Sequence, residues 1–217
     1  MYEMEFSYVD RLVDKGDIQK ALKKCDRRWK DSGSCEWAMK FCEVLEIYGD
    51  FAQSRDVREL IATDKSASDE VFFKNFDLMP KLYTKRVWKD VEAILVRTMK
   101  GDKFSPLTCS RRYVRYLEKK GDIDELYNIC LYQPALLDEL IETLRPRYEK
   151  ELGLVFEKYI LDLQRHGSYL KLYEETCELF KKYHGLGVDV TGAMAKLRDW
   201  YGNRKKLMKM LDELELG

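Results

Sequence analysis

The chain has 217 residues and a formal net charge of zero, because 39 Lys and Arg side chains balance 39 Asp and Glu side chains. No run approaches the roughly 18 uncharged apolar residues of a membrane span, and the first residues lack the pattern of a signal peptide, so we expect a cytoplasmic protein that does not enter a membrane. Only 12 glycines and 4 prolines are present, which disfavours turn-rich barrels and sandwiches and leaves long helices with short connections.

Turn residues and helical periodicity predict about a dozen helices. The clearest break is Gly16-Asp17, where glycine can end one helix in the left-handed conformation and aspartate can cap the next. The same pair returns at Gly49-Asp50 and at Gly121-Asp122. The expected helices span roughly residues 2–15, 17–30, 34–48, 50–63, 68–79, 80–100, 105–120, 122–132, 134–145, 146–165, 168–184 and 189–214.

The four prolines agree with these boundaries. Pro80, Pro106, Pro134 and Pro146 are each expected at the first position of a helix, where the missing N–H costs nothing. Residues 63–68 are the most linker-like stretch. We therefore expect a single helical domain over residues 1–217, with a possible seam near residues 64–68.

The breaks recur at a nearly constant spacing. Taken at positions 16, 49, 86, 121 and 167, they are separated by 33, 37, 35 and 46 residues, close to the period of about 34 residues typical of stacked helix–turn–helix repeats. The predicted fold class is all-α, a right-handed superhelix of helical hairpins. Stacked hairpins form a long concave surface that commonly holds a peptide or another protein.

The unit from Gly16 to Ala21, Gly-Asp-x-x-x-Ala, resembles the middle of a tetratricopeptide repeat. In that family the Gly-Asp turn joins two helices, and a small residue lets the second helix pack closely on the first. The position of Ala21 is taken by Ser54 in the second copy and by Leu126 in the third. The resemblance implies an α-solenoid that binds a protein or peptide partner.

The C-terminal third is similar to the helical tail of prokaryotic SWIM zinc-finger proteins. Those tails end in a basic turn, then Leu-Met, then acidic residues, and here Arg204-Lys205-Lys206-Leu207-Met208 and Asp212-Glu213 fit. The zinc finger of that family, C-x-C followed by C-x-H, is absent from the sequence. The resemblance therefore implies a helical-repeat module and carries over no zinc ligand.

No motif for catalysis, cofactor binding or metal binding stands out. The chain has neither a phosphate-binding glycine loop nor a C-x-x-C pair, and Cys177 and His184 are seven residues apart on one expected helix. We expect reduced thiols in the core; a disulfide or metal site is the alternative. The sequence thus predicts no enzyme and no cofactor, with an unrecognised hydrolase or transferase as the remote alternative. The six cysteines are Cys25, Cys35, Cys42, Cys109, Cys130 and Cys177.

Candidate partner-binding residues fall in two groups. On the first-helix faces we expect Trp37, Lys40 and Tyr48 to contact a protein or peptide. The other group comprises two basic clusters, which suggest a nucleic-acid-associated accessory module as the alternative function. Ordinary solvated helix faces, or cations favoured near a helix C-terminus, also explain these clusters in a chain with a pI near 6.8. The basic residues are Arg111, Arg112, Arg115 and Lys119, with Tyr113 and Tyr116 between them, and Arg204, Lys205 and Lys206.

Overall fold

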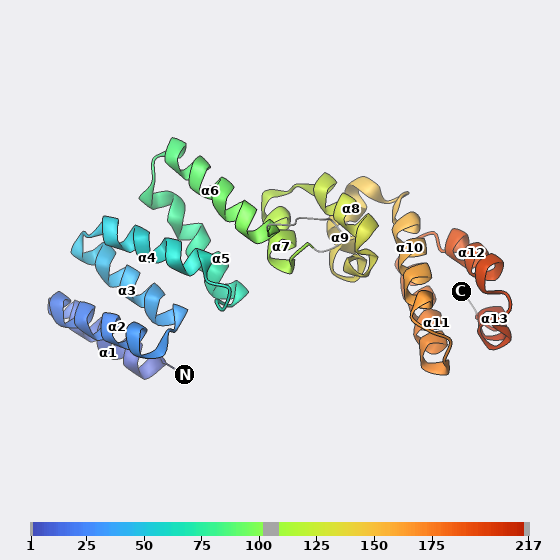
Figure 1. Cartoon of the computed structure of the whole chain (residues 1–217), viewed down its shortest axis with the longest axis horizontal. Helices are drawn as coiled ribbons and strands as arrows, with labels where there is room; N and C mark the ends of the chain where they lie inside the picture. Colours follow the sequence, from blue (N-terminus) through green and yellow to red (C-terminus); the bar gives the residue numbers. More distant parts are fainter. Residues whose placement is uncertain (1, 102–108, 215–217) are drawn as a thin grey trace. The chain divides into compact units, whose positions relative to one another are not determined.

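A computed structural model describes residues 2–101 and 109–214, and within them the chain is entirely helical, with no β-strand (Figure 1). The prediction of an all-α protein is confirmed. Cα packing divides the chain into two compact units, Met1–Asp102 and Lys103–Gly217, where the sequence predicted one domain. None of the helices in the described ranges is both long enough and apolar enough to span a membrane.

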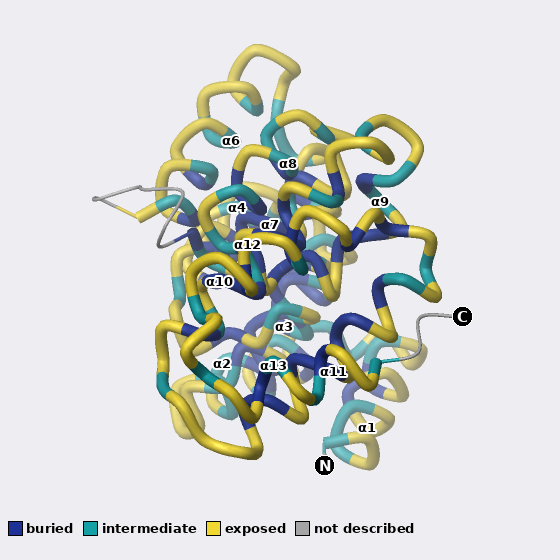
Figure 2. Tube along the Cα trace, turned by 90° about the vertical axis from the view of Figure 1, so that its right-hand side faces the viewer, coloured by how far each residue is buried: buried dark blue, intermediate teal, exposed yellow. Residues whose placement is uncertain are grey.

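The first unit consists of six α helices and one short 3₁₀ helix in its described part. Their bounds are α1 (Glu3–Asp14), α2 (Ile18–Ser32), α3 (Cys35–Tyr48), α4 (Phe51–Thr63), α5 (Asp69–Leu78), η1 (Met79–Leu82) and α6 (Lys85–Lys100). Helices α1 to α4 pack in sequence, each against the next. Buried and exposed positions alternate along most of these helices (Figure 2), as expected of amphipathic helices. Helix α3 differs, because eight of its fourteen residues are buried.

The described part of the second unit contains seven α helices and the 3₁₀ helix η3. Their bounds are α7 (Arg111–Lys120), α8 (Ile123–Tyr132), η3 (Pro134–Leu136), α9 (Leu137–Tyr148), α10 (Leu152–Arg165), α11 (Leu170–Gly185), α12 (Thr191–Tyr201) and α13 (Lys205–Asp212). Helix α10 packs against α9, α11 and α12, which makes it the central helix of this unit.

The Gly-Asp turns form as predicted. Gly49 and Gly121 have φ values of 91° and 69°, in the left-handed region that glycine enters at little cost. The Asp50 carboxylate accepts the backbone N–H of Gln53 at 3.0 Å, and Asp122 caps α8 in the same way. Asp17 also precedes a helix, but its carboxylate meets Lys20 at 3.1 Å instead of capping the backbone.

The three positions expected at the close contact within each hairpin are all fully buried. Ala21, Ser54 and Leu126 have no exposed surface, although their side chains differ in size and polarity. Ser54 is accommodated because its hydroxyl donates to the Glu46 carboxylate at 2.7 Å. A larger or polar residue is therefore tolerated where its hydroxyl finds a partner or the neighbouring helix leaves room.

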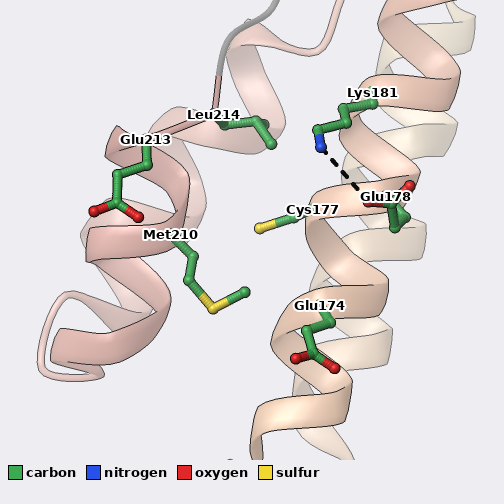
Figure 3. Close-up of a pocket in the computed structure, with 7 residues that line it drawn as sticks. All are labelled: Glu174, Cys177, Glu178, Lys181, Met210, Glu213 and Leu214. Carbon is green, nitrogen blue, oxygen red and sulfur yellow. Dashed lines mark ion pairs between the residues drawn. The ribbon is translucent and has the colours of Figure 1, made fainter.

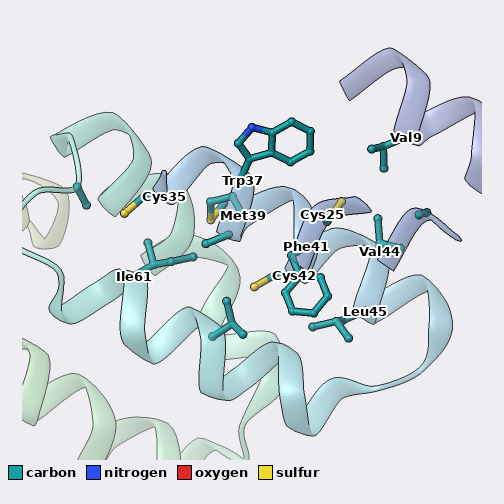
Figure 4. Close-up of a cluster of buried hydrophobic side chains, with 14 of the residues drawn as sticks. Val9, Cys25, Cys35, Trp37, Met39, Phe41, Cys42, Val44, Leu45 and Ile61 are labelled. Carbon is teal, nitrogen blue, oxygen red and sulfur yellow. The ribbon is translucent and has the colours of Figure 1, made fainter. Parts of the chain in front are cut away.

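The core of the first unit gathers side chains from α1 to α4 (Figure 4). Trp37 is fully buried, and its ring meets those of Tyr2 and Phe6 edge-on, with centroids 5.8 and 4.7 Å apart. Such pairs stabilise a core beyond the area that they bury. Two cysteines, Cys25 and Cys42, lie in the same core with no exposed surface.

A buried arginine joins three helices of the first unit. Arg58 on α4 is 1% exposed, and its guanidinium contacts the Glu46 carboxylate on α3 at 2.7 Å and the Asn75 side-chain oxygen on α5 at 3.1 Å. The Asn75 amide in turn donates to the backbone carbonyl of Arg58 at 2.8 Å. The charge is thus paired and hydrogen-bonded, the condition under which a buried arginine is tolerated.

The expected seam at residues 64–68 is a closed turn inside the first unit. The Asp64 carboxylate accepts the backbone N–H and the hydroxyl of Ser66, both at 2.7 Å, while Ala67 is buried in the core. Ser68 caps α5 by accepting the backbone N–H of Val71. Polar residues there serve caps and turns, which is why their composition resembled a linker. The boundary between the two units falls at residues 102 and 103.

Several expected boundaries are wrong. Pro146 lies inside α9, because the buried stripe of that helix continues to Leu144 and α10 begins only at Leu152. Pro80 is in η1, and α6 begins after Thr84, whose hydroxyl accepts the Val87 N–H, so no turn occurs at position 86. Residues 189–214 form two helices rather than one. Pro134 does open η3 as predicted, whereas Pro106 and the start of the expected helix 105–120 lie outside the described residues.

Candidate functional site

A hollow in the second unit lies along the C-terminal half of α10. It consists of two adjoining cavities of about 430 and 560 Å³, which share Tyr132, Pro134 and Asp162. One wall is the end of α8 with η3, and the other is α12. We call it the Tyr132–Trp200 hollow. Its lining residues are Leu131, Tyr132, Gln133, Pro134, Ala135, Glu157, Lys158, Tyr159, Leu161, Asp162, Leu163, Arg165, His166, Lys196 and Trp200.

Two large aromatic side chains at this hollow remain accessible. Tyr132 is 51% exposed and Trp200 is 54% exposed. Tyr132 is the last residue of α8, and the proline two positions later begins η3. The tyrosine therefore lies at the turn between these two helices. Trp200 lies in the last turn of α12. Exposed aromatic residues are enriched at protein interfaces, because they offer a large apolar face together with a polar group.

Close helix packing shapes the wall formed by α12. A Cβ atom on Gly153 would lie 2.7 Å from the backbone oxygen of Asp189, and one on Gly192 would lie 3.2 Å from a carboxylate oxygen of Glu157. Any larger side chain at Gly153 would push the segment before α12 away from α10. Gly153 therefore allows the segment just before the start of α12 to approach α10 closely.

The charged side chains of the hollow are largely paired. Glu157 is 9% exposed and pairs with Lys196 across the α10–α12 contact. Asp162 and Arg165 lie 3.6 Å apart on the exposed face of α10. Lys158 donates to the backbone carbonyl of Leu131 at 3.3 Å. The floor between these groups includes Leu161, which is 6% exposed.

The first basic cluster lies along α7, but its aromatic residues do not face solvent together. Arg111 pairs with Glu139 at 2.7 Å. Tyr113 is 3% exposed and lies parallel to Tyr116 with ring centroids 6.2 Å apart. A buried ring cannot stack on a nucleic-acid base. Arg115 and Lys119 are exposed, and Arg112 is half-buried.

The second basic cluster is divided by the break between α12 and α13. Arg204 turns inward, where its guanidinium donates to the backbone oxygen of Gly167 at 2.7 Å and to the side-chain oxygen of Gln164 at 2.8 Å. It also lies over the Tyr201 ring, 4.3 Å from the centroid. Only Lys205 and Lys206 of the three predicted residues are exposed. Arg204 thus has a structural role at the start of α13.

The candidates of the first unit separate into two places. Trp37 is a core residue with no exposed surface, so its indole offers nothing to a partner. Lys40 lies nearby, 6.0 Å from the centre of the Phe6 ring, and pairs with Asp10 at 2.5 Å and Glu43 at 3.1 Å. Tyr48 is at the far end of α3 and is 54% exposed. Of the three, Tyr48 is the one whose ring a partner can reach.

All six cysteines are buried, and no disulfide joins them in the part of the chain that the structure describes. Burial raises the pKa of Cys25 and Cys130 to about 12, which disfavours the reactive thiolate at neutral pH. Cys177 on α11 faces Met210 on α13 across a cavity of about 430 Å³, with Glu174 and Glu213 at its margins (Figure 3). Burial also raises the pKa of Cys177. Among the described residues, no group of three or more His, Cys, Asp or Glu side chains is arranged to hold a metal ion.

A carboxylate joins three helices of the second unit. Asp138 on α9 accepts hydrogen bonds from the Tyr183 hydroxyl and, at 2.6 Å, from the Lys182 ammonium on α11. The Tyr159 hydroxyl on α10 donates to it at 3.2 Å. Burial opposes ionisation of Asp138, but these donors outweigh it and lower its pKa. Burial and the neighbouring Asp138 raise the pKa of Tyr159 to about 12, so its hydroxyl stays protonated at neutral pH.

Comparisons with protein-family models, with curated proteins and with solved structures find no match to this chain. The Tyr132–Trp200 hollow therefore rests on its own geometry. The sequence did contain one signal for it, an aromatic residue directly before the Gln133-Pro134 break. No sequence pattern indicated that Trp200 lines the hollow, because its position there depends on how α12 packs against α10.

Proposed function

We propose that this chain is a non-enzymatic helical scaffold that binds a protein or peptide partner, and that the Tyr132–Trp200 hollow is its principal contact surface. The proposal is supported most by two aromatic side chains, each about half exposed, that line the same cavity of the second unit. Concave surfaces lined by aromatic and other apolar side chains together with a few polar groups are typical of binding sites.

We further propose that the hairpins are tetratricopeptide-like repeats that stack in a right-handed superhelix. Three Gly-Asp turns, each followed by a fully buried close-contact position, support this proposal. Buried cysteines that form no disulfide among the described residues are typical of proteins in a reducing compartment, which fits the cytoplasm. A crystal structure in which successive hairpins do not advance about one axis would refute the superhelix and leave the binding proposal to its own test.

The binding proposal is tested with a random dodecapeptide display library selected on the immobilised full chain. Affinities of selected peptides are then measured by fluorescence polarisation. Trp200→Ala and Tyr132→Ala are each expected to weaken binding roughly 30-fold, the effect of losing a buried aromatic contact of about 2 kcal/mol. Circular dichroism checks that each variant remains folded.

Two controls match the variants in exposure. Leu154→Ala removes a side chain that is 53% exposed on α10, and Tyr169→Ala removes a ring that is 54% exposed before α11; neither lines the hollow. Both should bind the peptides normally. Selected peptides whose affinity depends on Tyr48 but not on Trp200 would move the contact surface to the first unit. Failure to select any peptide that depends on the hollow would refute the proposal.

Nucleic acid is the other partner to be measured. A labelled 20-nucleotide single strand and the corresponding duplex are titrated with the full chain at low and moderate salt. Binding that falls steeply with salt and is lost on Arg115→Glu would favour the accessory-module function instead, because each phosphate contact releases counterions. The inward-facing Arg204 and the buried Tyr113 lead us to expect no such binding.

A further inference from the structure

The charged side chains of the Tyr132–Trp200 hollow differ in whether they have an ion-pair partner. Glu157 is already paired with Lys196, and Asp162 with Arg165, so neither carboxylate lacks a cation. Lys158 differs: it is exposed, its ammonium reaches a backbone carbonyl at 3.3 Å, and among the described residues no carboxylate pairs with it. The hollow thus presents one cation that has no counter-charge.

The apolar part of the hollow lies beside that cation. Lys158 is one turn before Leu161 along α10, and both line the same cavity as Tyr132 and Trp200. Residues three or four apart on a helix are neighbours on its surface. A ligand in this cavity therefore meets an apolar surface, two aromatic rings and the Lys158 ammonium in one place.

We infer that the hollow binds an extended peptide segment in which an aromatic or aliphatic side chain is followed closely by a carboxylate. The apolar side chain lies between Tyr132 and Trp200, and the carboxylate pairs with Lys158. This inference rests on the proposed function and specifies the chemistry of the partner. The carboxylate is an Asp or Glu side chain, since an extended segment that continues past Lys158 presents side chains there and not its terminus.

A basic segment fits the same hollow poorly. It would bring a positive charge next to Lys158, Lys196 and Arg165, while the two carboxylates present are already engaged. Like charges placed together at an interface disfavour the wrong partner. The arrangement therefore selects against lysine or arginine beside the apolar anchor.

The test uses the full chain and fluorescein-labelled heptapeptides with a central Trp or Leu. The following residue is Glu, Gln or Lys, and a separate pair places the only carboxylate at a free C-terminus or removes it by amidation. We expect Glu peptides to bind roughly three- to tenfold more tightly than Gln peptides, and Lys peptides to bind most weakly, as for a partly exposed ion pair. The free C-terminus should give a smaller gain than the Glu side chain, and a larger gain from the terminal carboxylate would overturn the assignment to a side chain.

Lys158→Gln should abolish the preference for the carboxylate while leaving the affinity for Gln peptides unchanged. Lys150→Gln is the control, because Lys150 is exposed in the same unit and lines neither cavity. Equal binding of Glu and Gln peptides, tighter binding of Lys peptides, or a preference that survives Lys158→Gln would overturn the inference but not the proposed function. If no heptapeptide binds in a Trp200-dependent manner, both fail.

Discussion

Each unit of the molecule joins three helices through one charged side chain, but the two charges have opposite signs and different surroundings. In the first unit the Arg58 guanidinium on α4 contacts groups on α3 and α5 and is 1% exposed. In the second unit the Asp138 carboxylate on α9 accepts from α10 and α11 and keeps about a third of its side chain exposed. Water reaches the Asp138 carboxylate but not the Arg58 guanidinium. Removing Arg58 should therefore lower the free energy of unfolding more than removing Asp138.

Arg58→Ala is expected to have the largest effect. It leaves the buried Asn75 oxygen without a donor and the Glu46 carboxylate without its cation, so we expect a loss of about 3–5 kcal/mol in the free energy of unfolding. Urea denaturation followed by circular dichroism measures it. Arg55→Ala, on the same helix but 42% exposed at the side chain, should change stability by less than about 0.5 kcal/mol. Equal losses of stability in the two variants would contradict a stabilising role for the buried contacts of Arg58.

Asp138→Ala should cost less, about 1–2 kcal/mol, because solvent replaces part of the lost interaction. The buried Tyr183 hydroxyl loses its acceptor, and this loss accounts for most of the effect. Tyr183→Phe is the matched variant: it removes the hydroxyl that donates to Asp138 and should recover part of the stability when combined with Asp138→Ala. Effects of the two substitutions that simply add would show that the pair is not coupled.

The pH dependence of stability should be the smallest effect, and it should further distinguish Asp138 from Arg58. The pKa of Asp138 is lowered in the folded protein, so its contribution is complete above the ordinary value of 3.8 and is lost as pH falls through the lowered value. The stability difference between the wild type and Asp138→Asn should thus be constant from about pH 8 to pH 5 and shrink below about pH 4. A difference that grows on acidification would mean that the carboxylate is not the stabilising form.

In both units the sequence revealed local turns, whereas contacts between helices distant in sequence were not foreseen. Gly49-Asp50 and Gly121-Asp122 were found by inspection, because a left-handed glycine and a capping aspartate act over a few residues. The burial of Arg58 was not, since it depends on Glu46 and Asn75 being brought to it by two other helices. The composition of residues 64–68 is ambiguous for a related reason: Asp64, Ser66 and Ser68 cap and bridge backbone groups here, and the same residue types are common in linkers.

The candidate site shows more clearly that contacts between distant residues cannot be read from the sequence. Arg204 appeared to belong to a basic surface, yet it faces inward because Gln164 and Gly167 offer oxygen atoms that sequence spacing does not reveal. Trp37 appeared to be a contact residue and is instead surrounded by Tyr2 and Phe6. Tyr132 and Trp200 are 68 positions apart in the sequence, and only the packing of α8, α10 and α12 makes them border one hollow.

Local chemistry alone established that this chain is helical, where three of its hairpins turn, and that its cysteines are buried. These properties follow from interactions over one or two helical turns, which the order of residues specifies directly. Tertiary packing decided which cations are exposed, where the chain divides into two units, and which aromatic rings remain accessible. Those outcomes depend on contacts between helices distant in sequence, whose free energies are settled only when every helix is in place.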